Sequence, residues 1–120
     1  MDDRLKKALD FSNYRISLFN KKEDLKIKFN TMLLHSCNGG NFKITQDLIC
    51  FVKLMIDSDR EDIILIDVNN NPIQITDPSE FFVEIIGKYI EATNFYYSEY
   101  SKLKKARSVS KLLDIVADGA

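Results

Sequence analysis

The sequence is organised around residues 79–107, which read SEFFVEIIGKYIEATNFYYSEYSKLKKAR. Apolar side chains recur there at steps of three and four residues, the spacing that places them on one face of an α-helix. Asp77 precedes the stretch as an N-cap, Pro78 suits the first helical position, and basic residues collect in the last turns. The pattern predicts a long helix over residues 78–107, which needs a partner of similar length to bury its apolar face.

The partner is expected in the N-terminal third of the chain. Residues 1–36 contain no Gly or Pro and carry two apolar seams at helical spacing. The first seam consists of Leu5, Leu9, Ser12, Ile16 and Phe19, and the second of Phe11, Leu18, Leu25 and Met32. At the polar residues 20–24 either one helix rotates its buried face or two helices meet at a kink. A single helix is favoured, because breaks usually carry Gly or Pro.

Residues 42–76 are expected to form a small α+β insert. The preceding Asn38-Gly39-Gly40-Asn41 ends the first helix in a turn and lacks the pattern of a phosphate-binding loop. Residues 42–44 alternate as a short strand, and Thr45 caps a helix over 46–57. A β-hairpin with its turn at residues 69–71 follows, which the first strand could join as a third strand.

A short amphipathic helix is expected over residues 108–116. Because the insert is small, the two long helices must return to the same place. The sequence therefore predicts one mainly helical α+β domain, residues 1–120, built as an antiparallel two-helix stalk with a β-α-β-β head.

Composition narrows the class of protein. The chain has 120 residues, a formal net charge of −1, 45% hydrophobic and 29% charged residues, which is typical of a soluble domain without an overall field for nucleic acid. Cys37 and Cys50 fit neither a disulfide framework nor a zinc pattern. The N-terminus does not read as a signal peptide, and no apolar run would span a bilayer. We expect a soluble, intracellular protein with no membrane partner.

No motif predicts catalysis or a cofactor. Asp67 opens an Asp-x-Asn-x-Asn sequence, but Pro72 replaces the Gly that a calcium loop requires, which favours a hairpin turn. His35 is the only histidine, and on a helix end it would point away from Cys37. The sequence predicts no enzyme, no metal, no small-molecule substrate and no effect of metal or nucleotide on the fold.

The aromatic and basic C-terminal segment is the candidate interaction site. Its members are Phe95, Tyr97, Lys102, Lys104, Lys105, Arg107, Leu112 and Leu113. Aromatic and basic residues together suit single-stranded nucleic acid, but the chain lacks a basic excess and lysines also suit a helix C-terminus. Phe95 and Tyr97 lie off the main seam, so one or both are expected to be exposed at a protein interface.

The chain resembles a small family of head-assembly proteins from T-even-like tailed bacteriophages and their marine relatives. The resemblance is carried by residues 1–14, Asn38-Gly39-Gly40 with Phe42, Ile66-Asp67 with Pro72-Ile73, residues 96–100, Lys102-Leu103-Lys104 and Arg107-Ser108-Val109. It implies a prohead core or internal scaffold component in the host cytoplasm, the prohead or the virion. It also implies no enzymatic activity, no cofactor, and association with itself and with other phage assembly proteins.

Two functions remain open on these grounds. The first is a structural or assembly protein acting through its helices. The second is a small phage regulator that binds nucleic acid or host RNA polymerase through residues 97–111. Phe81, Ile90, Phe95 and Tyr97 lie away from the central seam, and the helices carry more apolar surface than one pair can bury. A homo-oligomer weakened by Phe95→Ser or Tyr97→Ser is therefore expected; the alternative is that residues 109–116 fold back over part of this surface.

Overall fold

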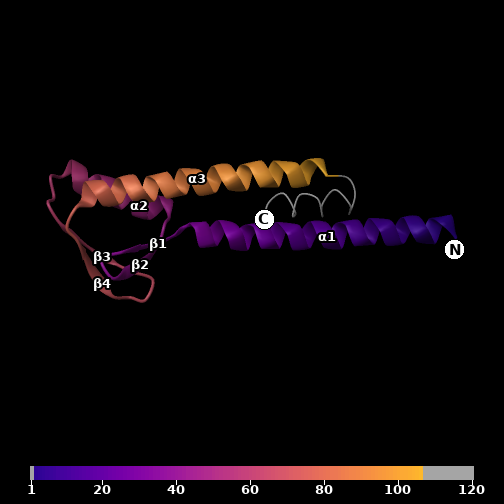
Figure 1. The fold of residues 1–120 in the computed structure, drawn as a ribbon, viewed down its shortest axis with the longest axis horizontal. Coiled ribbons are helices and arrows are strands. Elements are labelled where there is room, and N and C mark those ends of the chain that lie inside the picture. Colours follow the sequence, from indigo (N-terminus) through magenta and orange to yellow (C-terminus); the bar gives the residue numbers. More distant parts are fainter. Residues whose placement is uncertain (1, 107–120) are drawn as a thin grey trace. The chain divides into compact units, whose positions relative to one another are not determined.

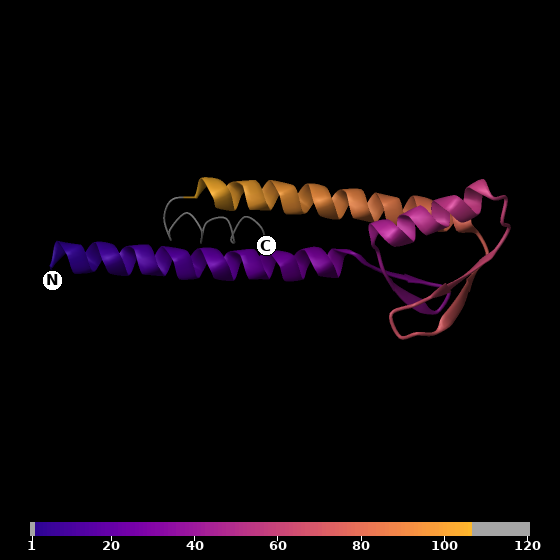
Figure 2. The ribbon, with the colours of Figure 1, turned by 180° about the vertical axis from the view of Figure 1, so that it is seen from behind.

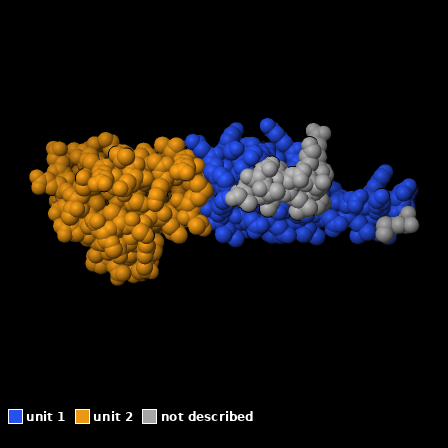
Figure 3. All heavy atoms as spheres, viewed as in Figure 1, with its two compact units in different colours: residues 1–29, 94–120 blue, residues 30–93 orange. Residues whose placement is uncertain are grey.

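The computed structural model describes residues 2–106, which form three helices and two β-hairpins (Figures 1 and 2). In chain order the elements are α1 (Asp3–Met32), β1 (Leu34–Cys37), β2 (Gly40–Lys43), α2 (Gln46–Asp57), β3 (Ile63–Ile66), β4 (Pro72–Ile75) and α3 (Pro78–Lys105). The predicted mainly helical α+β class is confirmed. The helix expected over 108–116 lies outside the described residues. The chain divides into two compact units, residues 30–93 and residues 1–29 with 94–120 (Figure 3).

The helix starts follow the predicted capping residues. The Thr45 hydroxyl accepts a hydrogen bond from the Leu48 amide (3.1 Å), and the Asp77 carboxylate accepts one from the Glu80 amide (3.1 Å). These side chains satisfy backbone donors that the first turn of a helix leaves without partners. α1 is one continuous helix through residues 20–24, so the alternative of two helices is excluded.

The end of the first helix was predicted wrongly. α1 stops at Met32 rather than at residue 36, because β1 pairs with β2 in an antiparallel hairpin. The turn is made by Asn38 (φ 52°) and Gly39 (φ 82°), both in the left-handed region that suits a two-residue hairpin. The insert is therefore β-β-α-β-β. β2 pairs only with β1, and the described strands form two separate two-stranded sheets, which also corrects the expected third strand.

The second hairpin is as predicted. Ile63 pairs with Ile75 and Ile66 with Pro72, so residues 69–71 lie in the turn. The two hairpins meet at Gly40, where a β-carbon would stand 2.6 Å from Cγ1 of Ile73. Only glycine allows this close approach.

The unit of residues 30–93 has a well-enclosed core. Its largest fully buried side chains are Phe81, Ile44, Ile75, Ile85 and Val52. The Phe42 and Phe81 rings meet edge to face, with centroids 5.4 Å apart. Phe81 was expected away from the central seam of its helix, and this was wrong: it is 2% exposed and packs against His35 of β1 and Phe42 of β2. α2 lies beside the first part of α3 (Figure 2), where Gln46 donates a hydrogen bond to the Tyr89 hydroxyl (2.9 Å).

The other unit is an antiparallel pair formed by α1 and the second part of α3. The Tyr14 hydroxyl donates to the carbonyl of Ala106 (2.8 Å), and the Phe29 and Tyr96 rings meet with centroids 4.7 Å apart. The predicted antiparallel pairing of the long helices is thus present in this unit. Its buried residues are Leu25, Leu103 and Ala106, surrounded by half-buried Tyr14, Leu18, Phe95, Tyr96 and Tyr100.

Candidate functional site

An exposed row of apolar side chains runs along α1. We call it the α1 stripe, and it consists of Leu5, Leu9, Ile16 and Phe19, whose exposed fractions lie between 46% and 64%. At 100° per residue these positions lie roughly opposite Tyr14, Leu18 and Leu25, which contact α3. The stripe corresponds to the first of the two sequence seams, whereas Leu18 and Leu25 of the second seam pack in the cluster with α3 and Phe11 of that seam stays 62% exposed.

A shallow hollow adjoins the stripe. It is lined by Phe11, Ser12, Arg15, Ile16 and Phe19, all on α1. The Arg15 guanidinium lies 5.8 Å from the centre of the Phe11 ring, a cation–π contact on an exposed surface. From Asp2 to Asn13 every residue of α1 is exposed. The surface is therefore apolar at its centre and charged at its margin, as protein interfaces are.

The two aromatic residues predicted for the interface differ in burial. Tyr97 is 75% exposed, which confirms the prediction that at least one of the two is exposed. Phe95 is half-buried against the cluster of Leu25, Leu103 and Ala106, and the Lys28 ammonium lies 4.9 Å from its ring centre. Phe95 therefore supports the helix pair, and its replacement is unsuitable as a probe of self-association.

The three lysines of the predicted site that the structure describes are exposed, but two of them have local partners. Lys102 pairs with Glu99 (3.0 Å), and the Lys104 ammonium lies 5.7 Å from the centre of the Tyr100 ring. Lys105 is exposed as well. Arg107, Leu112 and Leu113 lie outside the described residues.

Asp67 has a structural role in the Asp-x-Asn-x-Asn turn. Its Oδ1 accepts hydrogen bonds from the amides of Asn71 (2.9 Å) and Asn69 (3.0 Å), and its Oδ2 accepts one from Asn41 (3.1 Å). The Asn71 bond is the main reason that the pKa of Asp67 is lowered, and burial opposes it. Asn41 belongs to the first hairpin, so this carboxylate joins the two hairpins.

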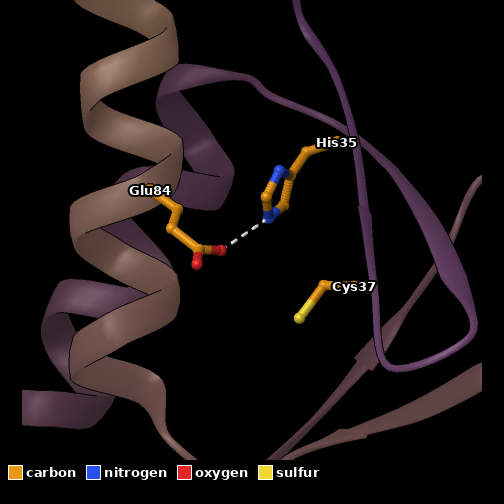
Figure 4. Close-up of side chains that lie close together, drawn as sticks. All are labelled: His35, Cys37 and Glu84. Carbon is orange, nitrogen blue, oxygen red and sulfur yellow. Dashed lines mark ion pairs between the residues drawn. The ribbon is translucent and has the colours of Figure 1, made fainter.

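The structure brings together three side chains that the sequence did not connect. His35 and Cys37 lie on β1 and Glu84 lies on α3, with one potential ligand atom from each within 4.8 Å of the others (Figure 4). The Nε2 of His35 is 3.0 Å from Oε2 of Glu84. His35 is buried, Cys37 is half-buried and the Glu84 side chain is 43% exposed.

His35 is unusual for a buried histidine. Its Nε2 lies at ion-pair distance from Glu84 but is not aligned for a hydrogen bond, and Nδ1 has no partner among the described residues. Burial, followed by the positive charge of Lys88, lowers the pKa of His35 although Glu84 raises it. Burial, Glu84 and Glu80 raise the pKa of the Cys37 thiol. Both pKa shifts favour the uncharged forms, the neutral imidazole and the protonated thiol.

The sequence prediction for His35 and Cys37 failed for a definable reason. On a helix end, residues two apart point in different directions, but on a strand they lie on the same face. Asn38-Gly39 is the dipeptide most typical of a type I′ hairpin turn, so this signal could have revealed β1. Glu84 could not be found in this way, because it reaches the cluster through packing of a distant helix.

The chain matches no protein-family model, no curated protein and no solved structure. Among the described residues, neither of the long helices nor α2 offers an apolar stretch sufficient to cross a bilayer.

Proposed function

We propose that this chain is a non-enzymatic structural or assembly protein that acts through contacts between helices. The α1 stripe carries the proposal, because it is an exposed apolar row opposite the face that α1 uses for α3. Monomeric proteins rarely leave large apolar surfaces uncovered unless a partner binds there. The partner that we assign to the stripe is a second copy of the chain, since two identical apolar rows are self-complementary about a twofold axis.

The energetics favour a weak contact. Full burial of a large apolar side chain contributes about 1.5–3 kcal/mol, and about half of that remains to be gained for side chains exposed to this degree. A dimer that buries both stripes would gain roughly 6–12 kcal/mol, against about 4–15 kcal/mol lost on association. Self-association is therefore expected to depend on concentration, and to strengthen when several contacts form in one assembly.

A prohead core or internal scaffold of a tailed bacteriophage is the assembly that we propose. The resemblance described above supports this role, with the host cytoplasm, the prohead or the virion as its place of action. Such a component associates with itself and with other assembly proteins, as the uncovered stripe allows. No membrane, cofactor or small-molecule substrate enters the proposal.

Light scattering of the full chain across a range of concentrations tests the proposal. We expect the mass to rise with concentration, and Ile16→Ser to shift this rise to at least several-fold higher concentration. Leu54→Ser is the matched control, because Leu54 on α2 is 58% exposed and Ile16 is 57% exposed. A mass that stays at one chain, or an equal effect of both variants, would exclude self-association through the stripe.

One observation supports the second candidate, a regulator that binds nucleic acid or host RNA polymerase through residues 97–111. Among the described residues, Tyr97 is the most exposed large hydrophobic side chain, and it lies on the same helix as the exposed Lys105. Against it, Lys102 and Lys104 have local partners and the net charge is −1. Retention on single-stranded DNA that weakens with salt and is lost in Tyr97→Ser would favour this candidate over assembly.

A further inference from the structure

We propose that His35, Cys37 and Glu84 bind a divalent transition-metal ion, with Zn²⁺ as the best match. The inference is independent of self-association and contradicts the expectation, drawn from the sequence, that metals have no role. That expectation assumed that His35 had no partner, whereas the structure places two further ligand types beside it (Figure 4).

The backbone holds the first two ligands in place. His35 pairs with Phe42 and Cys37 with Gly40 across the first hairpin, so both side chains leave the same face of β1. The His35 ring rests edge-on against the buried Phe81 ring, with centroids 5.6 Å apart. Pairing of β1 with β2 and packing of the His35 ring hold two ligands in place before a metal binds. Such a preorganised site lowers the free-energy cost of binding.

The hydrogen-bonding state of His35 points to a ligand. Its side chain is only 7% exposed, and neither ring nitrogen has a hydrogen-bond partner among the described residues. Leaving a buried polar group without a partner is unfavourable, and a purely structural role would be served better by an apolar side chain. The Nε2 atom is directed toward Glu84 and into the cluster (Figure 4). Coordination through Nε2 would let His35 and Glu84, whose Nε2 and Oε2 atoms are 3.0 Å apart, share one metal ion.

The donor set selects the class of metal. An imidazole nitrogen, a sulfur and a carboxylate oxygen are the three kinds of ligand that Zn²⁺ takes in proteins, whereas Mg²⁺ and Ca²⁺ require oxygen ligands. Tetrahedral zinc bonds place their ligand atoms about 3.3–3.5 Å apart. The cluster lies within 4.8 Å, so small side-chain adjustments would close it. Three protein ligands leave a fourth position for water on the solvent-exposed side of Glu84.

Some of the surrounding charges favour binding of a metal ion and others oppose it. Glu84 and Glu80 attract a dication, while Lys88 repels it. Binding replaces the thiol proton: the Cys37 S–H bond breaks, a sulfur–metal bond forms, and one proton passes to solvent, with no change of oxidation state. His35 enters as the neutral imidazole and releases no proton. Metal affinity is therefore expected to rise with pH in proportion to one proton released.

Titration of the reduced, chelator-treated full chain with Co²⁺ tests the site. Co²⁺ adopts the same geometry as Zn²⁺ and absorbs in the near ultraviolet when a thiolate binds it. We expect this absorption to saturate at one equivalent, to disappear when Zn²⁺ is added, and to be accompanied by a higher Tm with either metal. Cys37→Ser should abolish it, and Cys50→Ser, at the other free cysteine, should leave it unchanged.

A second pair of variants tests the carboxylate ligand. Loss of a residue that only supports a metal ligand weakens binding about 10- to 100-fold, so Glu84→Gln should weaken Co²⁺ binding at least as much. Glu80→Gln, one turn earlier on α3, should weaken it less. The proposal is overturned if the native chain gives no thiolate–cobalt absorption or if Cys50→Ser removes it. It is also overturned if Mg²⁺ raises the Tm as much as Zn²⁺ does.

Discussion

The two units of the molecule bury their apolar residues to different degrees. In residues 30–93, the side chains of Val52 and Ile85 are completely buried and Phe81 is 2% exposed. In the unit of α1 and the second part of α3, the largest buried side chains are Leu25 and Leu103, and the aromatic residues around them are half-buried. Residues 30–93 are also richer in Ile, Leu, Val and Met, with 21 such residues in 64 against 7 in the 41 described residues of the other unit, so composition contributes to the difference.

The number of layers adds to this difference in burial. In residues 30–93, two hairpins and two helices enclose the core from several directions. A side chain such as Phe81 therefore meets neighbours on every side. An isolated helix pair covers one face of each helix, and the α1 stripe remains on the other face. A small layered unit can therefore complete its own core, whereas a helix pair of this kind needs a further partner to do so.

The largest effect is expected when equivalent phenylalanines of the two units are truncated. Phe81→Ala should lower the free energy of unfolding by about 3–5 kcal/mol. Phe95→Ala should cost roughly half as much, because Phe95 is only half-buried. Denaturant unfolding of both variants measures the difference, and equal losses would remove the distinction between the two cores.

A smaller effect is expected from adding a methyl group where the hairpins meet. Gly40→Ala should cost about 1–3 kcal/mol, because the new carbon would overlap Ile73. Gly87→Ala is the control, since its new carbon meets nothing within 4 Å and alanine favours a helix, so stability should rise by about 0.5–1 kcal/mol. Thermal unfolding of the two variants should give shifts of opposite sign; a stabilised Gly40→Ala protein would show that the hairpin contact is loose.

In the helix pair, one side-chain hydrogen bond can be removed selectively. Tyr14→Phe deletes the bond to the carbonyl of Ala106 and keeps the ring, so a loss of about 0.5–1.5 kcal/mol is expected. Tyr97→Phe, at an exposed position, should change nothing measurable. Denaturant unfolding measures both variants. Equal free energies of unfolding would show that this hydrogen bond does not stabilise the end of the helix pair.

The smallest effect concerns pH and belongs to the hairpins. The pKa of Asp67 is lowered from its ordinary value of 3.8, chiefly by the hydrogen bond from Asn71. A lowered pKa means that the unfolded chain binds the proton more readily, so this stabilisation is complete well above pH 3.8 and decreases as the pH falls through the folded value. In Asp67→Asn the free energy of unfolding, measured by denaturant unfolding at a series of pH values, should depend less on pH in this acid range. If its dependence on pH is unchanged, other carboxylates cause the loss of stability in acid.

Much of the fold was predictable from local sequence signals. Thr45 and Asp77 cap their helices, and the turn at residues 69–71 joins two strands with β-type patterning, so each signal agrees with its final structure. The end of α1 was not predictable from helix propensity, because cross-strand pairing with β2 overrides it at residues 34–36.

The predicted interaction site and the proposed metal site also differ in how far local sequence signals reveal them. Exposure of Tyr97 follows from its position on a helical wheel, which the sequence contains. The cluster of His35, Cys37 and Glu84 depends on a strand that was missed and on contact with a distant helix. Local periodicity describes one helix or strand at a time, so it cannot predict a contact between side chains of β1 and α3.

The two-stranded sheets have a consequence for aggregation. Every strand in the described residues is an edge strand, and exposed edges can template pairing with strands of other molecules. Each strand has only four residues, and Pro72 in β4 has no amide to donate. The Asn38 side chain also donates to the carbonyl of Gln74 on β4 (2.9 Å), which occupies one acceptor of that edge. These short, interrupted edges offer little template for pairing with the strands of another molecule.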